Sequence, residues 1–375
     1  MLIAGEASGD LLAAELVSAL GEKLPDAKFF GAGGAKMSAA GVELAFDLTQ
    51  HSVIGISDVL KNYFKFRRLF NQLLALAIER KPGVVIGVDY GGFNLRFGHA
   101  IKEYVRNNPF SKWNPKIVQF VSPQVWASRP GRANLLAADY DLLLSIFPFE
   151  KDWYAQRAPK LRVEFVGHPM VERLKAESRS QKSEVSAASP KILLLPGSRK
   201  SELQRHLPVM LAALKLIQEK LPAAKVKMIS PNELLARLAK SLGAHLEIQI
   251  GNLPQALAQA DVAIASTGTV TMECAFFGVP TVTLYKTSRF TYEIAKRIVT
   301  VKSLTMPNLM AGEEIFPEFI QSTATPENIS RAALELLQDE SHRTKIKSQL
   351  TKIISSLGEP GASYRAAKAI LSLFT

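Results

Sequence analysis

Four short segments of the sequence combine glycine with hydroxyl, carboxylate or guanidinium side chains, the groups that bind anions and transfer protons. One of them, residues 266–273, reads Ser-Thr-Gly-Thr-Val-Thr-Met-Glu and joins an apolar run to a helical pattern. Backbone N–H groups at the start of a helix attract anions, and small side chains leave them accessible. We expect Glu273 to accept hydrogen bonds from ribose hydroxyls. The residues expected to bind a nucleotide diphosphate are Ser266, Thr267, Gly268 and Thr269.

The second segment, Pro196-Gly197-Ser198-Arg199, follows the apolar run Ile192–Leu195. Gly197 and Ser198 leave backbone donors exposed, and a guanidinium group binds two phosphate oxygens at once. We expect Arg199 to clamp phosphate oxygens; the alternative is a turn with a solvated arginine. Residues 266–273 contain neither a Walker A sequence nor a Gly-x-Gly-x-x-Gly fingerprint, which disfavours ATP hydrolysis and NAD binding.

The third segment, Gly5-Glu6-Ala7-Ser8-Gly9-Asp10, directly follows a short apolar run at residues 2–4. Its glycines allow a tight turn close to a ligand, and the helix start behind it favours anions. We expect Glu6, Ser8 and Asp10 to bind sugar hydroxyls. The alternative for Asp10 is that it only caps a helix beginning at Leu11.

The fourth segment, Asp89-Tyr90-Gly91-Gly92-Phe93-Asn94, follows the most hydrophobic strand pattern of the N-terminal half. A carboxylate at the carboxyl end of a buried strand, with glycines clearing space beside it, suits a general base. Partial burial would raise its basicity. We therefore expect Asp89 to take a proton from a substrate hydroxyl; the alternative is an aspartate that only forms the turn.

The composition restricts the class of protein. With 375 residues, 47% of them apolar, the chain is long enough for two α/β domains and is not disordered. Its net charge of +12 fits nucleic acid, anionic lipid or a phosphorylated substrate, or solubility alone. Nucleic acid is disfavoured because no dense basic run is interleaved with aromatic residues.

The same data indicate a compartment. The single cysteine, Cys274, excludes a disulfide scaffold and favours a reducing compartment. No window approaches the roughly 18 uninterrupted apolar residues of a membrane span, and the start of the chain reads as a strand and turn, with no signal sequence. We expect a cytoplasmic protein that can still touch a membrane.

Apolar runs alternate with helical patterns in two series, which is typical of parallel sheets covered on both faces. The segment Lys175–Pro190 is rich in Ser, Ala, Lys and Glu and is interpreted as a linker between the series. We predict two doubly wound domains with the ligand in a cleft at the strand carboxyl ends. The predicted strands are 2–4, 28–30, 84–88, 116–121, 142–146 and 163–166, then 192–195, 226–229, 246–250, 262–265 and 281–284.

Two further signals need an interpretation. Asp139-Tyr140-Asp141 looks like a metal motif, but it precedes the apolar run Leu142–Ile146, so we place it at the sheet edge away from the ligand. The six histidines show no ligand spacing, and we expect no metal site and no cofactor. His168, after the last strand of the first series, is equally consistent with a structural hydrogen bond and a substrate contact.

The segment Val59–Leu74 combines an aromatic stripe with a basic one. Its basic residues are Lys61, Lys65, Arg67 and Arg68. A basic helix with several large aromatic residues is typical of an element that contacts lipid, although a core-facing helix is the alternative. The residues expected to contact a membrane or an acyl chain are Tyr63, Phe64, Phe66 and Phe70.

Taken together, these turns resemble the lipid-A-disaccharide synthase family of bacterial glycosyltransferases. The resemblance follows an ordered set of motifs over nearly the whole chain, which makes it highly specific. The matching stretches are Ala4–Asp10, Gly87–Asp89 with Phe93-Asn94, Phe120–Ala127, Phe147–Lys151, Val166–Met170, Leu194–Arg199, Ser266–Glu273 and Pro307–Leu309.

The resemblance implies a GT-B fold: residues 1–174, completed by a C-terminal helix at about 345–375, bind the acceptor, and residues 190–344 bind the nucleotide sugar. It implies transfer from UDP-2,3-diacylglucosamine to the 6-hydroxyl of 2,3-diacylglucosamine 1-phosphate, with inversion, to give a β-1,6 disaccharide and UDP. By this resemblance Asp89 is the base, Arg199 is a donor-site residue, and Glu6, Ser8, Glu273 and Asn308 belong to the conserved polar set. We therefore expect Asp89, Glu6 and Arg199 to act in catalysis, and Asn308 to belong to the substrate-binding set.

The resemblance also implies peripheral association with the inner face of the cytoplasmic membrane, and it suggests a homodimer. The chain departs from the family pattern at Gly91-Gly92, where a second carboxylate is lost, and at Ser128, where the family has tryptophan. Two other functions remain as alternatives. One is a UDP-N-acetylglucosamine 2-epimerase-like enzyme, and the other is a non-catalytic protein that binds nucleotide sugars or anionic lipid.

Overall fold

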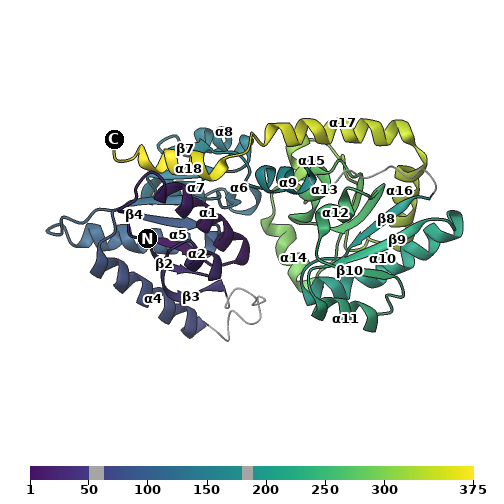
Figure 1. Ribbon diagram of the computed structural model, residues 1–375, viewed down its shortest axis with the longest axis horizontal. Helices are drawn as coiled ribbons and strands as arrows, with labels where there is room; N and C mark the ends of the chain where they lie inside the picture. Colours follow the sequence, from purple (N-terminus) through teal and green to yellow (C-terminus); the bar gives the residue numbers. More distant parts are fainter. Residues whose placement is uncertain (50–62, 180–188) are drawn as a thin grey trace. The chain divides into compact units, whose positions relative to one another are not determined.

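The computed structural model describes residues 1–49, 63–179 and 189–375, and the chain divides into two compact units. The first unit contains Met1–Pro169 and Leu357–Thr375, and the second contains Met170–Ser356 (Figure 1). The last helix, α18 (Ala362–Leu371), therefore belongs with the start of the chain, and α17 (Glu340–Ser356) belongs to the second unit. The family resemblance implied a return to the first domain from about residue 345.

In the described part of the first unit, seven strands form one parallel sheet in the order β3-β2-β1-β4-β5-β6-β7. Chain order reverses between β1 and β4. The strands are β1 (Leu2–Ala4), β2 (Phe30–Gly33), β3 (Glu43–Asp47), β4 (Val84–Val88), β5 (Lys116–Phe120), β6 (Leu142–Ser145) and β7 (Val163–Phe165).

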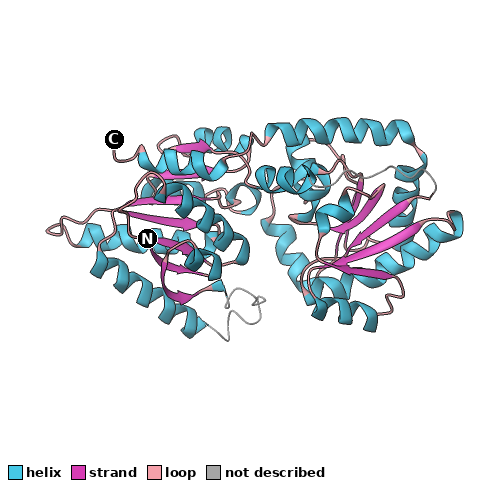
Figure 2. Ribbon diagram, in the orientation of Figure 1, coloured by secondary structure: helices cyan, strands magenta, loops and turns pink. Residues whose placement is uncertain are grey.

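Helices flank this sheet, as the cyan ribbons around the magenta strands show (Figure 2). Strands of unbroken apolar residues need cover on both faces, and the connecting helices supply it. The helices are α1 (Ala7–Gly21), α2 (Ala35–Ala39), α4 (Tyr63–Arg80), α5 (Gly91–Asn107), α6 (Val125–Ser128), α7 (Arg132–Asp139), α8 (Pro148–Arg157) and α18.

The described part of the second unit has a six-stranded parallel sheet in the order β10-β9-β8-β11-β12-β13, reversing between β8 and β11. The strands are β8 (Lys191–Leu195), β9 (Lys225–Ser230), β10 (Glu247–Ile250), β11 (Val262–Ser266), β12 (Thr281–Tyr285) and β13 (Glu318–Ile320). The helices are α9 (Met170–Arg179), α10 (Lys200–Lys220), α11 (Glu233–Ser241), α12 (Leu253–Leu257), α13 (Val270–Phe276), α14 (Arg289–Ile298), α15 (Met306–Ala311), α16 (Pro326–Gln338) and α17.

Helix α18 is fastened to the first unit by contacts far apart in sequence. It packs against α1, where Ser363 Oγ donates to a carboxylate oxygen of Glu15. The Arg365 guanidinium donates to the Val166 carbonyl at 2.8 Å. The backbone N–H of His168 donates to the Leu357 carbonyl at 2.9 Å, and the His168 ring packs against Phe147. His168 thus has a structural contact at the point where the chain returns.

Some elements differ from the sequence prediction. Strand β2 begins at Phe30, where the predicted strand ended. The prediction missed it because the sequence Phe-Gly-Ala-Gly carries little strand signal. Gly31 is needed there, since a Cβ at this position would lie 1.8 Å from the Leu2 carbonyl oxygen of the neighbouring strand. The edge strands β3 and β13 were not predicted. Residues 175–179 of the expected linker are the end of α9, and 180–188 lie outside the described residues.

Asp10 has a different role from either one expected. Helix α1 begins at Ala7, so Asp10 lies one turn inside it, and its side chain is 4% exposed. Its carboxylate accepts hydrogen bonds from the backbone N–H groups of Gly34, Lys36 and Met37, at 2.7, 2.9 and 3.1 Å. Asp10 therefore caps α2 and not its own helix, and its burial leaves the carboxylate little accessible surface for a sugar.

We expect Asp10→Ala to lower the free energy of unfolding by about 2–3 kcal/mol, because several buried backbone donors lose a charged acceptor. Urea denaturation followed by circular dichroism measures the change. Asp26→Ala, which removes an exposed carboxylate from the same unit, is the matched control and should change little. Equal effects of the two substitutions would contradict the capping role.

Candidate active site

The two places where chain order reverses carry the four chemistry-bearing turns. In open parallel sheets, ligands bind outside the carboxyl ends of the strands at such a switch point. In the first unit, β1 and β4 end there and lead into Gly5–Asp10 and Asp89–Asn94. In the second unit, β8 and β11 lead into Pro196–Arg199 and Ser266–Glu273. Each unit therefore has a candidate site assembled from two distant stretches of sequence.

Asp89 is held in an unusual backbone conformation. Asp89 and Tyr90 both have positive φ, 52° and 47°, which costs roughly 1–3 kcal/mol per residue. Two amide side chains fix this turn, because Asn94 Nδ2 and Gln119 Nε2 both donate to the Asp89 carbonyl at 2.8 Å. Gln119 was not singled out in the sequence, although a buried polar residue inside the apolar strand β5 was a visible signal.

The chemistry of the Asp89 carboxyl suits a base. Burial raises its pKa above the usual value, while hydrogen bonds from the Tyr90 backbone and the Ser8 side chain oppose the increase. The Ser8 contact joins the β1 turn to the β4 turn. Glu6 is exposed at the N-cap of α1. Burial raises the pKa of Tyr90, and the negative charge of Glu6 raises it further. Glu6, Ser8 and Asp89 are therefore gathered in one region, as expected.

A pocket of about 280 Å³ opens beside Asp89 and is bounded by residues from three turns of the first unit. Its wall includes Ser122, Ser128 and Arg132. Trp126 anchors the wall, because its Nε1 donates to the buried Glu150 at 3.0 Å. Burial raises the pKa of Glu150 to about 7, against hydrogen bonds from Trp126 and the Phe147 backbone that lower it. Arg132 had no signal in the sequence, whereas Ser122 and Glu150 lie in stretches that carry the family resemblance but were not given a role.

The second unit has a pocket of about 410 Å³ at its own switch point. The predicted residues that line it are Gly197, Ser198, Arg199, Ser266, Thr267, Gly268, Thr269 and Glu273. The structure thus brings together the two stretches expected to bind a nucleotide diphosphate. The Arg199 side chain is 75% exposed and its Nη1 donates to Glu202 Oε1 at 3.1 Å, so its other donors are accessible from the pocket.

One detail of this pocket differs from the expectation. The backbone N–H groups of Ser198 and Arg199 are not exposed donors, because both donate to Glu202 Oε2, at 3.1 and 3.3 Å. Glu202 lies in the first turn of α10 and satisfies the free donors of its own helix start. Gly197 is required beside it, since a Cβ there would lie 2.6 Å from the same carboxylate oxygen. Phosphate contacts therefore fall to the Arg199 side chain and the Thr267–Thr269 loop.

Glu273 and Asn308 have contrasting environments. Burial raises the pKa of Glu273 to about 7, with Arg173 lowering it and Glu177 raising it. Asn308 is 1% exposed and all its side-chain bonding capacity is used. Its Oδ1 accepts from two backbone N–H groups, and its Nδ2 donates to the Phe316 carbonyl and to Glu318. Asn308 therefore holds α15 to β13 and has no capacity left for a substrate, which corrects its assignment to the substrate-binding set.

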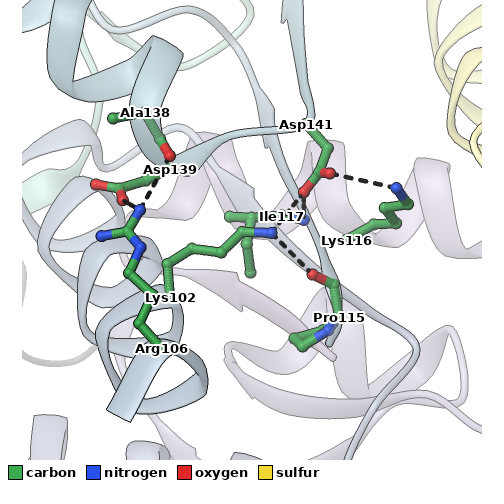
Figure 3. A network of polar contacts seen from close by, with 8 residues as sticks. All are labelled: Lys102, Arg106, Pro115, Lys116, Ile117, Ala138, Asp139 and Asp141. Carbon is green, nitrogen blue, oxygen red and sulfur yellow. Dashed lines mark hydrogen bonds and ion pairs between the residues drawn. The ribbon is translucent and has the colours of Figure 1, made fainter. Parts of the chain in front are cut away.

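The Asp139-Tyr140-Asp141 segment lies at the opposite, amino-terminal edge of the first sheet. Asp141 accepts from Lys102 at 3.0 Å, from Lys116 and from the Ile117 backbone, while Asp139 accepts from Arg106 (Figure 3). Burial opposes ionisation of Asp141, but these donors lower its pKa overall. Both carboxylates are neutralised by cations of the protein. Within the described residues, no cluster of His, Cys, Asp and Glu is arranged to hold a metal ion.

The aromatic residues of helix α4 that were expected to contact lipid lie in different surroundings. Phe64 is 79% exposed, whereas Phe70 packs against Phe93 and Phe97 with ring centroids 5.4 and 5.5 Å apart. Phe66 and Phe70 both line an apolar pocket of about 430 Å³. The side chain of Tyr63 and residues 59–62, including Lys61, lie outside the described residues.

Comparison with known proteins decides the family. The family model described as lipid-A-disaccharide synthetase matches residues 1–373. The chain belongs to this family. A lipid-A-disaccharide synthase from Myxococcus xanthus is 34% identical over 382 residues, covering 100% of this chain and 97% of the relative. Another from Trichlorobacter lovleyi is 35% identical over 384 residues, with the same coverage. Membership makes the protein a glycosyltransferase with a nucleotide-sugar donor and a lipid acceptor.

Solved structures show the same fold at low identity. The calicheamicin glycosyltransferase CalG4 has a TM-score of 0.60 and 15% identity, covering 99% of this chain and 96% of that one. A Neisseria meningitidis UDP-GlcNAc 2-epimerase bound to UDP-GlcNAc has a TM-score of 0.55 and 12% identity, covering 97% of each chain. The expected GT-B class of two parallel α/β domains is confirmed. The epimerase-like alternative rests on fold similarity alone.

We expect the affinity for UDP-N-acetylglucosamine to rise about tenfold between pH 6 and pH 8. With a pKa of about 7, Glu273 is mostly protonated at pH 6 and mostly ionised at pH 8, and only the carboxylate accepts both ribose hydroxyls. Isothermal titration calorimetry measures the affinity, and this diphosphate diester keeps its charge over that range. Glu273→Gln should bind more weakly with a flat pH profile; an unchanged slope in the variant would contradict the role of Glu273.

Proposed function

We propose that the protein transfers the sugar of UDP-2,3-diacylglucosamine to the 6-hydroxyl of 2,3-diacylglucosamine 1-phosphate, with inversion. The products are the β-1,6 lipid A disaccharide 1-phosphate and UDP. One observation carries the proposal: in a chain of this family, the switch point of one unit holds a carboxylate of raised pKa, and that of the other holds an arginine-lined pocket.

In the proposed step, Asp89 accepts the proton of the acceptor hydroxyl. The freed oxygen electrons form the bond to the anomeric carbon while the bond to the UDP oxygen breaks, so one displacement inverts the centre. Loss of the second carboxylate at Gly91-Gly92 leaves this role to Asp89, and a single base is sufficient for inversion. Glu6 and Ser8 bind acceptor hydroxyls beside it, which keeps the attacking oxygen oriented.

The donor occupies the second unit in this proposal. Arg199 and the Thr267–Thr269 loop bind the diphosphate and stabilise the charge that develops on the leaving UDP. Glu273 binds the ribose. The Neisseria meningitidis epimerase of the same fold is bound to UDP-GlcNAc, which supports a UDP-sugar as the ligand of this pocket.

We expect Asp89→Asn to reduce disaccharide formation by about 10²–10⁴-fold while UDP binding stays within twofold, because the amide cannot accept the proton. Arg199→Ala should instead weaken UDP binding. The assay incubates the protein with both acylated substrates and follows release of UDP and the disaccharide.

Each variant serves as the control for the other. Equal loss of UDP binding and turnover in Asp89→Asn would remove its role as base, and unaltered UDP affinity in Arg199→Ala would remove the phosphate clamp. If the wild-type protein released no UDP with these two substrates, the proposed reaction itself would fail.

We also propose that the protein is peripherally bound to the inner face of the cytoplasmic membrane through helix α4. No helix in the described ranges meets the length and hydropathy of a membrane span. At the start of α4, the exposed Phe64 lies among the exposed cations Lys65, Arg67 and Arg68. An apolar ring surrounded by positive charge suits an anionic membrane surface. The homodimer suggested by the family resemblance stays a prediction.

Phe64→Ser should weaken binding to vesicles of phosphatidylethanolamine and phosphatidylglycerol roughly tenfold to a hundredfold, since a buried phenyl ring contributes about 1.5–3 kcal/mol. Vesicle co-sedimentation measures the binding. Phe110→Ser is the matched control, because Phe110 is 100% exposed in the same unit but lies outside α4. A loss of folding stability in Phe64→Ser, without a loss of vesicle binding, would refute the membrane role.

A further inference from the structure

The pocket beside Asp89 has an excess of positive charge. Arg129 and Arg132 line it, on the loop that follows α6 and at the first residue of α7. Arg96, on the exposed side of α5, lines the apolar pocket next to it. The two pockets share Gly92, so they are neighbours in the first unit.

The charges of Arg129 and Arg96 both act on Arg132. Burial lowers the pKa of Arg132, and the charges of Arg129 and Arg96 lower it further. Like charges that line neighbouring pockets repel each other, which costs electrostatic energy. The arrangement is therefore one that an anion between the three guanidinium groups would stabilise.

None of the three guanidinium groups has an anionic partner among the residues that the structure describes. Other arginines of the unit do: Arg106 pairs with Asp139, and Arg80 pairs with Glu43. The one carboxylate lining the same pocket is Asp89, which burial already disfavours as an anion. The pocket wall thus offers several guanidinium donors to a multivalent anion from outside the protein.

We propose that Arg96, Arg129 and Arg132 form a subsite for the phosphate group of the acceptor sugar. This inference rests on the proposed function and adds a specificity element to it. Arginine matches phosphate because its planar donors bind two oxygens at once, and three arginines can satisfy all the terminal oxygens of a phosphate monoester.

The position of the subsite matters for orientation. The pocket contains both Asp89 and two of the arginines, so a sugar bound with its phosphate against the guanidinium groups has its other end confined near the base. The phosphate would then select which hydroxyl faces Asp89. The neighbouring apolar pocket, lined by Phe66, Phe70 and Phe93, leaves an apolar surface for an acyl chain of the same molecule.

The diphosphate of the donor is the other possible source of the anion, and kinetics distinguish the two. Initial rates of UDP release are measured with 2,3-diacylglucosamine 1-phosphate and with its phosphate-free counterpart, for wild type and for Arg129→Gln/Arg132→Gln. We expect kcat/KM for the phosphorylated acceptor to fall roughly tenfold to a hundredfold, the range for losing charge-assisted hydrogen bonds. The rate with the phosphate-free acceptor and the KM for the donor should stay within twofold.

Two further variants sharpen the test. Arg132→Lys keeps the charge but loses the two-pronged donor, so it should retain part of the preference for the phosphorylated acceptor. Lys160→Gln removes one exposed positive charge from the same unit, outside both pockets, and should leave the preference unchanged.

Equal loss with both acceptors would overturn the inference, because it would give the arginines a structural or general catalytic role. A raised donor KM would overturn it as well, by assigning the arginines to the donor diphosphate. Both results leave the proposed function standing, since wild type would still form the disaccharide. Absence of turnover in wild type would instead refute the proposed function, and this inference with it.

Discussion

Both units depend on one constraint, which is that every described strand pairing is parallel. The turns that lead from the carboxyl end of a strand into the next helix therefore all lie at the same edge of each sheet. Where chain order reverses, adjacent strands lead their helices to opposite faces and leave space between the turns. The turn after β1 meets the turn after β4, and the turn after β8 meets that after β11. The side chains proposed for proton transfer and for binding the donor lie in those four turns.

The base site shows how the protein holds a strained turn in place. Two successive non-glycine residues, Asp89 and Tyr90, adopt left-handed conformations that an isolated peptide would leave. Their shape persists because Asn94 and Gln119 donate to the same Asp89 carbonyl from a helix and a neighbouring strand. The carboxyl group is thereby kept partly buried, and the burial supplies the raised pKa that a base needs at neutral pH.

Charge is distributed differently at the two edges of the first sheet. At the amino edge, Asp139 and Asp141 are paired with Arg106, Lys102 and Lys116, so each of these carboxylates has a cationic partner within the protein. At the carboxyl edge, positive side chains exceed the negative ones, and the unmatched charge faces a pocket. The net charge of +12 is therefore unevenly distributed, and part of the excess positive charge lies at the pocket beside Asp89.

The parallel α/β class, most strands, the four turns and the family could be predicted from the sequence, because each depends on local apolar runs, glycine and an ordered set of motifs. The roles of Asp10, Asn308 and Glu202 became visible in the folded chain alone, since a side chain's hydrogen-bond partners depend on which segments fold beside it. The three backbone donors that Asp10 caps lie 24 to 27 residues away in sequence. The grouping of Arg96 with Arg129 and Arg132 likewise follows from how α5 and α7 pack on one sheet, which no spacing along the chain encodes.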